Sequence, residues 1–233
     1  MQGALLKPPT TDAVVGTIEL KLDWREGNNS LFDISGTGTV LAKQGRVLLL
    51  GLARGGYGKS RGFVLTRKSF EHVRARVTLD CRWKWEAFGQ HEFDQFKRLT
   101  LRAIVGTGPA LQIIDRKTVG LLAGAAYLYS YERLDQRAGT IDAGVRFFEH
   151  RASLYLTGRQ LLGENATLIQ TIYVQPRIDD PGDVRVLGEL ALISKLSTRI
   201  ALTNGFTIAY DRTPPDQIRR FDTELKVGII VTF

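Results

Sequence analysis

The stretch His72-Val73-Arg74-Ala75-Arg76-Val77-Thr78-Leu79-Asp80-Cys81-Arg82-Trp83-Lys84-Trp85 alternates between polar and apolar side chains. A strand turns successive side chains to opposite faces, whereas a helix would scatter this pattern around its whole circumference. The stretch therefore predicts a β-strand, and the alternation extends it back to Phe70. One face of this strand is apolar. The other is strongly charged and carries a row of arginines: Arg74, Arg76 and Arg82.

The charge on the polar face argues against a soluble β-sandwich. Burying such a row between two packed sheets would cost several kcal/mol for each unpaired charge. A membrane barrel removes this cost, because its apolar face contacts lipid and its charged face lines a hydrated interior. We therefore predict an all-β fold, a transmembrane antiparallel up-and-down β-barrel.

The same period of two recurs along most of the chain, and the repeats set the number of strands. Together with residues 70–85, the alternating segments are 15–24, 32–40, 45–57, 84–94, 97–111, 117–131, 150–160, 167–178, 183–195, 198–211 and 222–233. This predicts about twelve strands, and an even number is usual for a bacterial single-chain barrel. We expect residues 1–13 to form a periplasmic N-terminal tail and residues 14–233 to form the barrel.

The connections between these segments alternate in length. Short turns are predicted at residues 43–45, 163–165 and 195–197, on the periplasmic side. Longer loops are predicted on the extracellular side, at residues 25–30, 59–69, 132–149, 179–183 and 211–220. Residues 138–148 also alternate, so they either lengthen the eighth strand or form a hairpin within the longest loop.

Composition excludes several other classes of protein. The chain has 233 residues, 43% of them hydrophobic, but no apolar run of the roughly 18 residues that a membrane-spanning helix needs. The single cysteine, Cys81, cannot form an internal disulfide or a cysteine metal cluster. The net charge of +8 is spread along the chain, so we predict no nucleic-acid partner. Residues 1–9 lack the features of a secretory signal, and we interpret the sequence as a mature chain without its signal peptide.

The chain ends on an alternating segment with a terminal aromatic residue. Its apolar positions are Leu225, Val227, Ile229, Val231 and Phe233. This segment resembles the C-terminal signature of outer-membrane proteins, which the barrel-assembly machinery reads. The resemblance implies that this machinery is a partner during biogenesis and that the protein resides in the outer membrane of a Gram-negative bacterium. There we expect a monomer in contact with membrane lipid and lipopolysaccharide.

The chain also resembles a known family from about Gly27 onward. The resemblance rests on the segments 27–30, 57–62, 92–99, 209–215 and 221–225, in this order and spacing. It is weakest over residues 133–150. The sequence is similar to the YdiY-like family of salt-induced outer membrane proteins, which carries a domain of unknown function. The resemblance implies a barrel in the outer membrane and brings no catalytic residues.

The charged inner face is the candidate functional feature. The alternation along each strand assigns every side chain to the outer or the inner face, and we call this assignment strand parity. The residues that strand parity places in the lumen, where they would line any pore, are Glu19, Arg74, Arg76, Asp80, Arg82, Glu86, Arg98, Arg102, Glu189, Arg199, Glu224 and Lys226. Four further charged residues share this face by the same rule: Asp23, Arg46, Arg54 and Glu92. A mutually neutralised network would fill a narrow barrel of this size. An excess of arginine in an open lumen would instead favour small anionic solutes. Both hypotheses stay open: a narrow channel, or a structural, stress-related barrel.

Enzymatic activity is the third hypothesis. Outer-membrane lipid hydrolases need a histidine beside a nucleophilic serine, and His91 is the best candidate for the histidine. No serine has an obvious claim to pair with it, although Ser69 and Ser130 lie on adjacent or nearby strands. Residues 53–60 match a relaxed phosphate-binding loop, but no helix is expected after them, so we interpret them as an extracellular glycine-rich turn. The three histidines, His72, His91 and His150, are too scattered to indicate a metal site. We therefore predict no enzyme, no metal and no cofactor, with lipid hydrolysis as an alternative.

Overall fold

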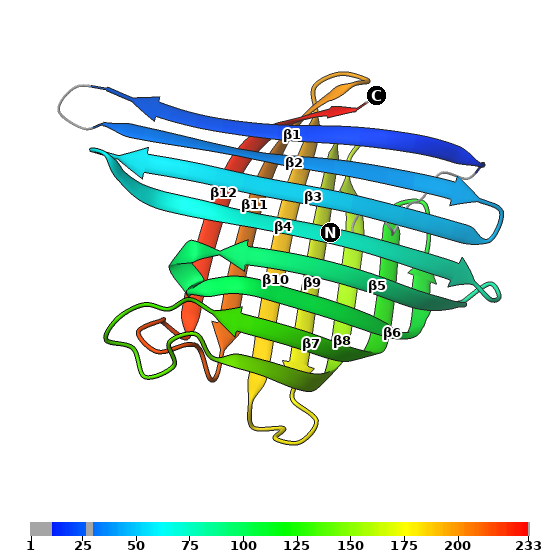
Figure 1. Cartoon of the computed structure of the whole chain (residues 1–233). Helices are drawn as coiled ribbons and strands as arrows, with labels where there is room; N and C mark the ends of the chain where they lie inside the picture. Colours follow the sequence, from blue (N-terminus) through cyan, green and yellow to red (C-terminus); the bar gives the residue numbers. More distant parts are fainter. Residues whose placement is uncertain (1–10, 27–29, 233) are drawn as a thin grey trace.

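The computed structural model describes residues 11–26 and 30–232, and in them twelve strands close into one antiparallel barrel (Figure 1). Each strand pairs with its neighbours in sequence, and β1 also pairs with β12. The predicted fold class and strand number are confirmed. The strands are β1 (Ala13–Arg25), β2 (Leu31–Gln44), β3 (Val47–Ser60), β4 (Phe63–Thr78), β5 (Trp83–Asp94), β6 (Leu99–Asp115), β7 (Val119–Leu134), β8 (Arg146–Leu162), β9 (Ala166–Pro176), β10 (Val184–Lys195), β11 (Ile200–Asp211) and β12 (Phe221–Thr232).

The barrel closes through a short seam. Residues Thr17–Leu20 of β1 pair with Ile229–Thr232 of β12, whereas β1 pairs with β2 along its whole length. Closure gives both terminal strands a partner on each side, so neither leaves a complete unpaired edge. A sheet needs such backbone pairing in order to cross lipid, and at the seam the pairing extends over four residue pairs.

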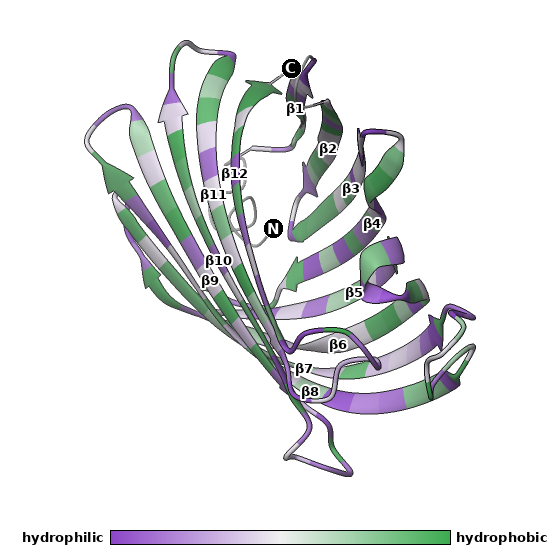
Figure 2. Cartoon of the chain, turned by 90° about the vertical axis from the view of Figure 1, so that its left-hand side faces the viewer, coloured by the Kyte–Doolittle hydropathy of each residue, from purple (hydrophilic) through white to green (hydrophobic). Residues whose placement is uncertain are grey.

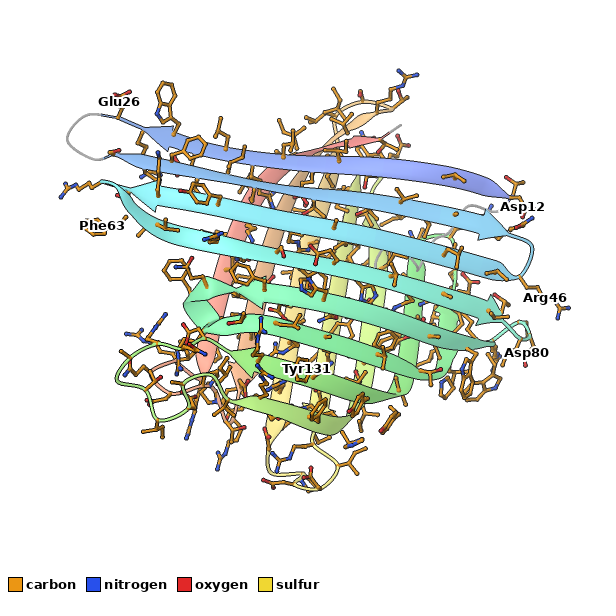
Figure 3. All side chains as sticks on the ribbon, viewed as in Figure 1. Asp12, Glu26, Arg46, Phe63, Asp80 and Tyr131 are labelled. Carbon is orange, nitrogen blue, oxygen red and sulfur yellow. The ribbon has the colours of Figure 1, made fainter. Side chains whose placement is uncertain are left out.

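The two ends of the barrel differ in their connections. At one end, here called the turn end, short turns follow β2, β4, β6, β8 and β10, and Asp12, Arg46 and Asp80 mark it in Figure 3. At the other end, the loop end, the connections include residues 135–145, 177–183 and 212–220, and Glu26 and Phe63 mark it in the same view. The long loops therefore gather at one end, as predicted.

The two faces of the sheet differ as the alternation predicts. Hydrophilic and hydrophobic bands alternate along the strands in Figure 2. The outward side chains include many exposed apolar residues, for example Leu20, Val73, Leu154 and Leu225. Trp24, Trp83 and Trp85 lie exposed on this face near strand ends, where interfacial aromatic belts form. No helix in the described part of the chain is long and apolar enough to cross a membrane.

One predicted strand was too long. The alternation over residues 70–85 continues without a break through the tight turn between β4 and β5. There the carboxylate of Asp80 accepts hydrogen bonds from the backbone N–H groups of Arg82 and Trp83, each at 2.7 Å. Such a side-chain-to-backbone bond favours a turn over an extended chain. Asp80 and Arg82 consequently lie exposed at the turn end and not on the inner wall.

The predicted loop at residues 59–69 is also wrong. Strands β3 and β4 continue as a hairpin and are joined by Arg61 and Gly62 alone, both with positive φ (46° and 84°). A two-residue turn of this kind needs a residue that tolerates the left-handed region, which glycine does. The glycine-rich residues 53–60 thus belong to strand β3 and form neither a turn nor a phosphate-binding loop.

The longest loop resolves the open question about residues 138–148. Strand β8 begins at Arg146, so the last three of these residues lengthen the strand and the others belong to the loop. At the N-terminus, β1 begins at Ala13. The predicted tail lies mostly in residues 1–10, and the terminal Phe233 of the predicted assembly signal also lies outside the described residues.

Gly124 has no side chain, and the inward-pointing ring of Tyr155 occupies the space beside it. A Cβ atom there would lie 2.2 Å from a ring carbon of Tyr155 on the neighbouring strand. We expect Gly124→Ala to lower the free energy of unfolding by about 1–3 kcal/mol, because the ring must move or the strands must separate. Gly158→Ala is the matched control, since its Cβ would meet only Leu121, at 3.8 Å. Urea unfolding in lipid vesicles measures both, and equal stabilities would contradict the packing argument.

Candidate functional site

The inner wall brings most of the predicted residues together. Arg74, Arg76 and Glu86 are buried inside the barrel, and a second group of the predicted residues lines its cavities: Glu19, Arg54, Glu92, Arg102, Glu189, Glu224 and Lys226. Arg46 and Arg199 lie exposed in turns, as Asp80 and Arg82 do, and Arg98 lies in the connection between β5 and β6. These positions are geometric, and a role in lining a pore stays a prediction.

A first network crosses the lumen at Glu86. Its carboxylate accepts from Arg74 at 2.8 Å and from Arg76 at 2.6 Å, both on β4. The hydroxyl of Tyr155, which reaches across from β8, donates to the same carboxylate at 2.7 Å. Glu86 is only 2% exposed, so one buried carboxylate supplies a counter-charge to two buried guanidinium groups.

A second network crosses the lumen at Glu132 of β7. Its carboxylate accepts from Arg102 of β6 at 2.8 Å and from Arg185 of β10 at 2.5 Å. Strands β7 and β10 are not neighbours in the sheet, so the Arg185 contact bridges the interior. Arg151 of β8 extends this network toward the loop end through ion pairs with Glu149 and Asp183, at 2.8 and 2.9 Å.

A third network joins opposite walls beside the cavities. Lys68 of β4 donates to Glu224 of β12 at 2.9 Å, and Lys226 of β12 contacts the other oxygen of the same carboxylate at 2.5 Å. These side chains are less enclosed than Glu86, with exposed fractions of 24–39%. Two cations therefore share one carboxylate at a position that remains accessible from the lumen.

Two cavities lie among these networks inside the described part of the barrel. The cavity at the loop end has a volume of about 330 Å³, and the one nearer the turn end has about 250 Å³. They share six lining residues, which we call the junction: Arg54, Lys68, Glu189, Thr207, Glu224 and Lys226. Because these side chains line both cavities, the junction lies between the two cavities along the barrel.

The inner wall is not polar throughout. Leu41 of β2 and Leu48 and Leu50 of β3 form a buried cluster that faces inward near the turn end. The alternation predicted a polar inner face. The inner faces of β4 and β5 are mainly polar, apart from Phe70 and Phe88, whereas β3 carries leucine on both faces. Water enters an apolar constriction less readily than a polar one. At the level of this cluster we therefore expect water to occupy only the side of the lumen that faces the opposite wall.

Arg98 ties the loops together over the mouth of the barrel. Its guanidinium donates to Asp135 at 2.9 Å, to Thr140 at 2.8 Å and to the Asp142 carboxylate, all in the loop between β7 and β8. It also donates to the backbone oxygen of Asp216, at 2.9 Å, in the loop between β11 and β12. One fully buried side chain therefore holds two loops against the loop-end cavity.

The charge state of Asp142 strengthens its hydrogen bond with Arg98. Burial acts to raise the pKa of its carboxyl, but hydrogen bonds from the Asp216 N–H and from Arg98 outweigh burial and lower the pKa below its usual value. Asp142 is therefore ionised at neutral pH, where its charge-assisted bonds are strongest. We call residues 135–145 and 212–220, joined through Arg98, the loop cap.

Removal of Arg98 is expected to loosen the loop cap. Arg98→Ala deletes hydrogen bonds to four groups, so trypsin cleavage after Arg137 should accelerate at least tenfold, which needs only about 1.4 kcal/mol of local stability. Arg82→Ala, in an exposed turn at the other end, is the control and should leave cleavage unchanged. Equal rates for Arg98→Ala and the unmodified protein would show that the loops are held by other contacts.

The sequence matches the family described as "Protein of unknown function, DUF481" over residues 18–233. The chain belongs to this family. The DUF481 match covers every strand of the barrel from the middle of β1 onward. The finer YdiY-like name, and the salt-induced expression that it implies, stay predictions.

Solved structures show the same fold as this DUF481 barrel. The COG4313 outer membrane channel from Pseudomonas putida F1 superposes with a TM-score of 0.58 at 11% identity, covering 98% of each chain. The NanC porin superposes with a TM-score of 0.55 at 9% identity, covering 93% of this chain and 98% of the porin. At these identities the likeness concerns the fold alone, which is that of outer-membrane barrels. A comparison with curated protein sequences found no match.

The candidate catalytic histidine of the DUF481 chain does not meet a serine. His91 lies on the outer face of β5 and contacts the carboxylate of Glu71 on β4. Ser130 is 3% exposed and faces inward from β7, on the opposite side of the wall. Ser69 is two positions from Glu71 on β4 and pairs in register with Phe93, not with His91.

Several inner-wall residues were missed by the sequence reasoning. Lys68 and Glu132 fell within predicted loops, as did Glu149. Lys68 is in phase with His72 and Arg74, so extending the alternation of β4 toward its start would have placed it correctly. Arg151 and Arg185 were inside predicted strands but were not singled out. Parity alone could not indicate that they reach carboxylates on other strands.

Proposed function

We propose that this protein is an outer-membrane channel for small solutes with a preference for anions. The observation that carries the proposal is the junction, where two lumen cavities share six residues. Free volume on both sides of the junction supports a path along the barrel, which a filled barrel of this size would not offer. The networks at Glu86 and Glu132 occupy the rest of the lumen and hold the wall around that path rigid.

Charge at the junction supports the preference for anions. Three of its side chains are cationic and two are carboxylates: Arg54, Lys68 and Lys226 against Glu189 and Glu224. In a narrow lumen with low-dielectric walls, an excess of one sign concentrates counter-ions of the other. Arg74 and Arg102, two of the arginines predicted to face the lumen, pair with the buried carboxylates of Glu86 and Glu132, which are 3% and 2% exposed. They contribute less to this preference than Lys68 and Lys226, whose shared partner Glu224 is 39% exposed.

Several findings support an outer-membrane location. The outer face is apolar, the fold is that of an outer-membrane channel and a porin, and four described residues of the predicted assembly signal face outward from β12: Leu225, Val227, Ile229 and Val231. We infer a barrel inserted by the barrel-assembly machinery, with the loop end outside the cell and the turn end in the periplasm.

Chloride entry into proteoliposomes tests the proposal. Vesicles loaded with a halide-quenched dye should lose fluorescence when they contain folded protein, and they should keep it when they contain heat-unfolded protein. Folding is verified by the change in gel mobility upon boiling. Folded protein that leaves the dye unquenched would reject the channel.

A second candidate function is a closed structural barrel. The observation that favours it is the extent of the networks, since both Glu86 and Glu132 link strands across the lumen. If the leucine cluster and the loop cap close the two ends, the cavities hold only trapped water. In that case the Arg98→Ala variant would also fail to admit chloride, whereas a gated channel would admit more.

We also propose that the protein is not a lipid hydrolase, because His91 and Ser130 lie on opposite faces of the wall. Incubation of pure folded protein with phospholipid or lipid A should release no fatty acid. Release that disappears in His91→Ala would establish the enzyme instead.

A further inference from the structure

Two arginines lie side by side on the outer face at the loop end. Arg133 of β7 and Arg146 of β8 are direct partners in register. Like charges directly opposite one another destabilise a strand pair. Within residues 11–26 and 30–232, neither guanidinium has a hydrogen-bond or ion-pair partner. Two inward arginines near this end, Arg98 and Arg151, are by contrast paired with carboxylates.

The outer face below this arginine pair is aromatic. Tyr131 pairs with Phe148, with ring centroids 5.0 Å apart, and Tyr129 pairs with His150 at 5.1 Å. The hydroxyl of Tyr127 contacts Nδ1 of His150 at 2.5 Å and closes the cluster (Tyr131 is labelled in Figure 3). Rings with a polar group of this kind gather where the hydrocarbon of a membrane meets its headgroups.

Farther from the loop end, the same two strands become aliphatic. The outward pairs are alanine on β7 with leucine on β8: Ala125–Leu154 and Ala123–Leu156. Leu154 and Leu156 are 51% and 42% exposed. From the rim downward the surface therefore changes from cationic to aromatic to aliphatic. A lipid molecule has the same order of a charged headgroup, an interfacial backbone and acyl chains.

We propose that Arg133 and Arg146 bind a phosphate group of lipid A in the outer leaflet, with its acyl chains lying along Leu154 and Leu156. Two guanidinium groups side by side can each donate paired hydrogen bonds to a phosphate, and its charge relieves their mutual repulsion. The site rests on the outer-membrane location proposed above. It does not depend on whether the lumen conducts.

Binding of lipid A to the folded protein in detergent tests this site. Native mass spectrometry would compare diphosphoryl lipid A with dephosphorylated lipid A on the unmodified protein and on the double variant Arg133→Gln/Arg146→Gln. The matched control is Arg46→Gln/Arg116→Gln, which removes two exposed arginines at the turn end. Gel mobility before and after boiling verifies that each variant is folded.

We expect the Arg133→Gln/Arg146→Gln variant to bind diphosphoryl lipid A at least tenfold more weakly, and the control to bind it as the unmodified protein does. Dephosphorylated lipid A should bind weakly to all three. Equal binding by the double variant, or equal binding of the dephosphorylated lipid, would overturn the site. Complete displacement by inorganic phosphate alone would show a free-anion site and would overturn the lipid as its ligand. Chloride entry into vesicles of neutral phospholipid should be the same for the double variant and the unmodified protein, so this test and that of the channel can fail separately.

Discussion

Glu86→Ala is expected to lower the free energy of unfolding by about 3–5 kcal/mol, the usual cost of breaking a buried ion pair by removing one partner. The substitution leaves Arg74 and Arg76 buried with their main counter-charge gone, and it deprives the Tyr155 hydroxyl of its acceptor. Urea unfolding in lipid vesicles, followed by gel mobility, measures the loss.

Two variants make this result interpretable. Glu164→Ala removes an exposed carboxylate in a turn and should change stability by less than about 0.5 kcal/mol. Glu86→Gln keeps the shape and some hydrogen bonds but loses the charge, so it should fall between the two. A cost below about 1 kcal/mol for Glu86→Ala would mean that water neutralises the two guanidinium groups, and that the lumen is wetter at this level than we describe.

Charge reversal at the junction is expected to invert the ion preference of the channel. Lys68→Glu/Lys226→Glu leaves one cationic and four carboxylate side chains among the six residues there. Because counter-ions of the opposite sign are concentrated in a narrow lumen, the reversal potential under a salt gradient should change sign. Planar bilayer recording with potassium chloride measures it.

If the four clustered carboxylates of Lys68→Glu/Lys226→Glu prevent folding, the neutral variant Lys68→Gln/Lys226→Gln provides a second test. It should lose the anion preference without gaining a cation preference. Lys117→Glu/Lys195→Glu, at exposed positions of the turn end, controls for a general change in surface charge and should keep the sign of the unmodified protein. An unchanged sign in both junction variants would mean that ions do not pass the junction.

The alternation of apolar and polar side chains was sufficient to predict the fold, because a strand between lipid and a hydrated lumen requires this alternation. Outward strand positions within the hydrocarbon of the membrane are mostly apolar, so each strand and its outward face could be predicted from its own segment, for example from residues 222–233. The errors arose where local chemistry interrupts a strand without interrupting the alternation. Asp80 ends β4 by accepting bonds from the next backbone N–H groups, and Gly62 allows a hairpin where a long loop was expected.

The candidate site could be predicted only in part, because parity assigns a face but not a partner. Glu86 and Glu224 lie on the inner wall, the face to which the alternation assigned them, yet their contacts with Tyr155 and Lys68 come from strands on the other side of the lumen. Those contacts depend on which strands face each other across the closed barrel. The leucine cluster was missed for a related reason, since the expectation of a polar interior ignored the inward leucines of β3.

A planar bilayer recording of the unmodified protein under a potassium chloride gradient tests the account most directly. Folded protein should insert and give discrete conductance steps, with a reversal potential that reports a preference for chloride over potassium. Discrete steps with a preference for potassium would contradict the role of the junction. Folded, inserted protein that gives no steps would contradict the open lumen itself and would favour the closed structural barrel.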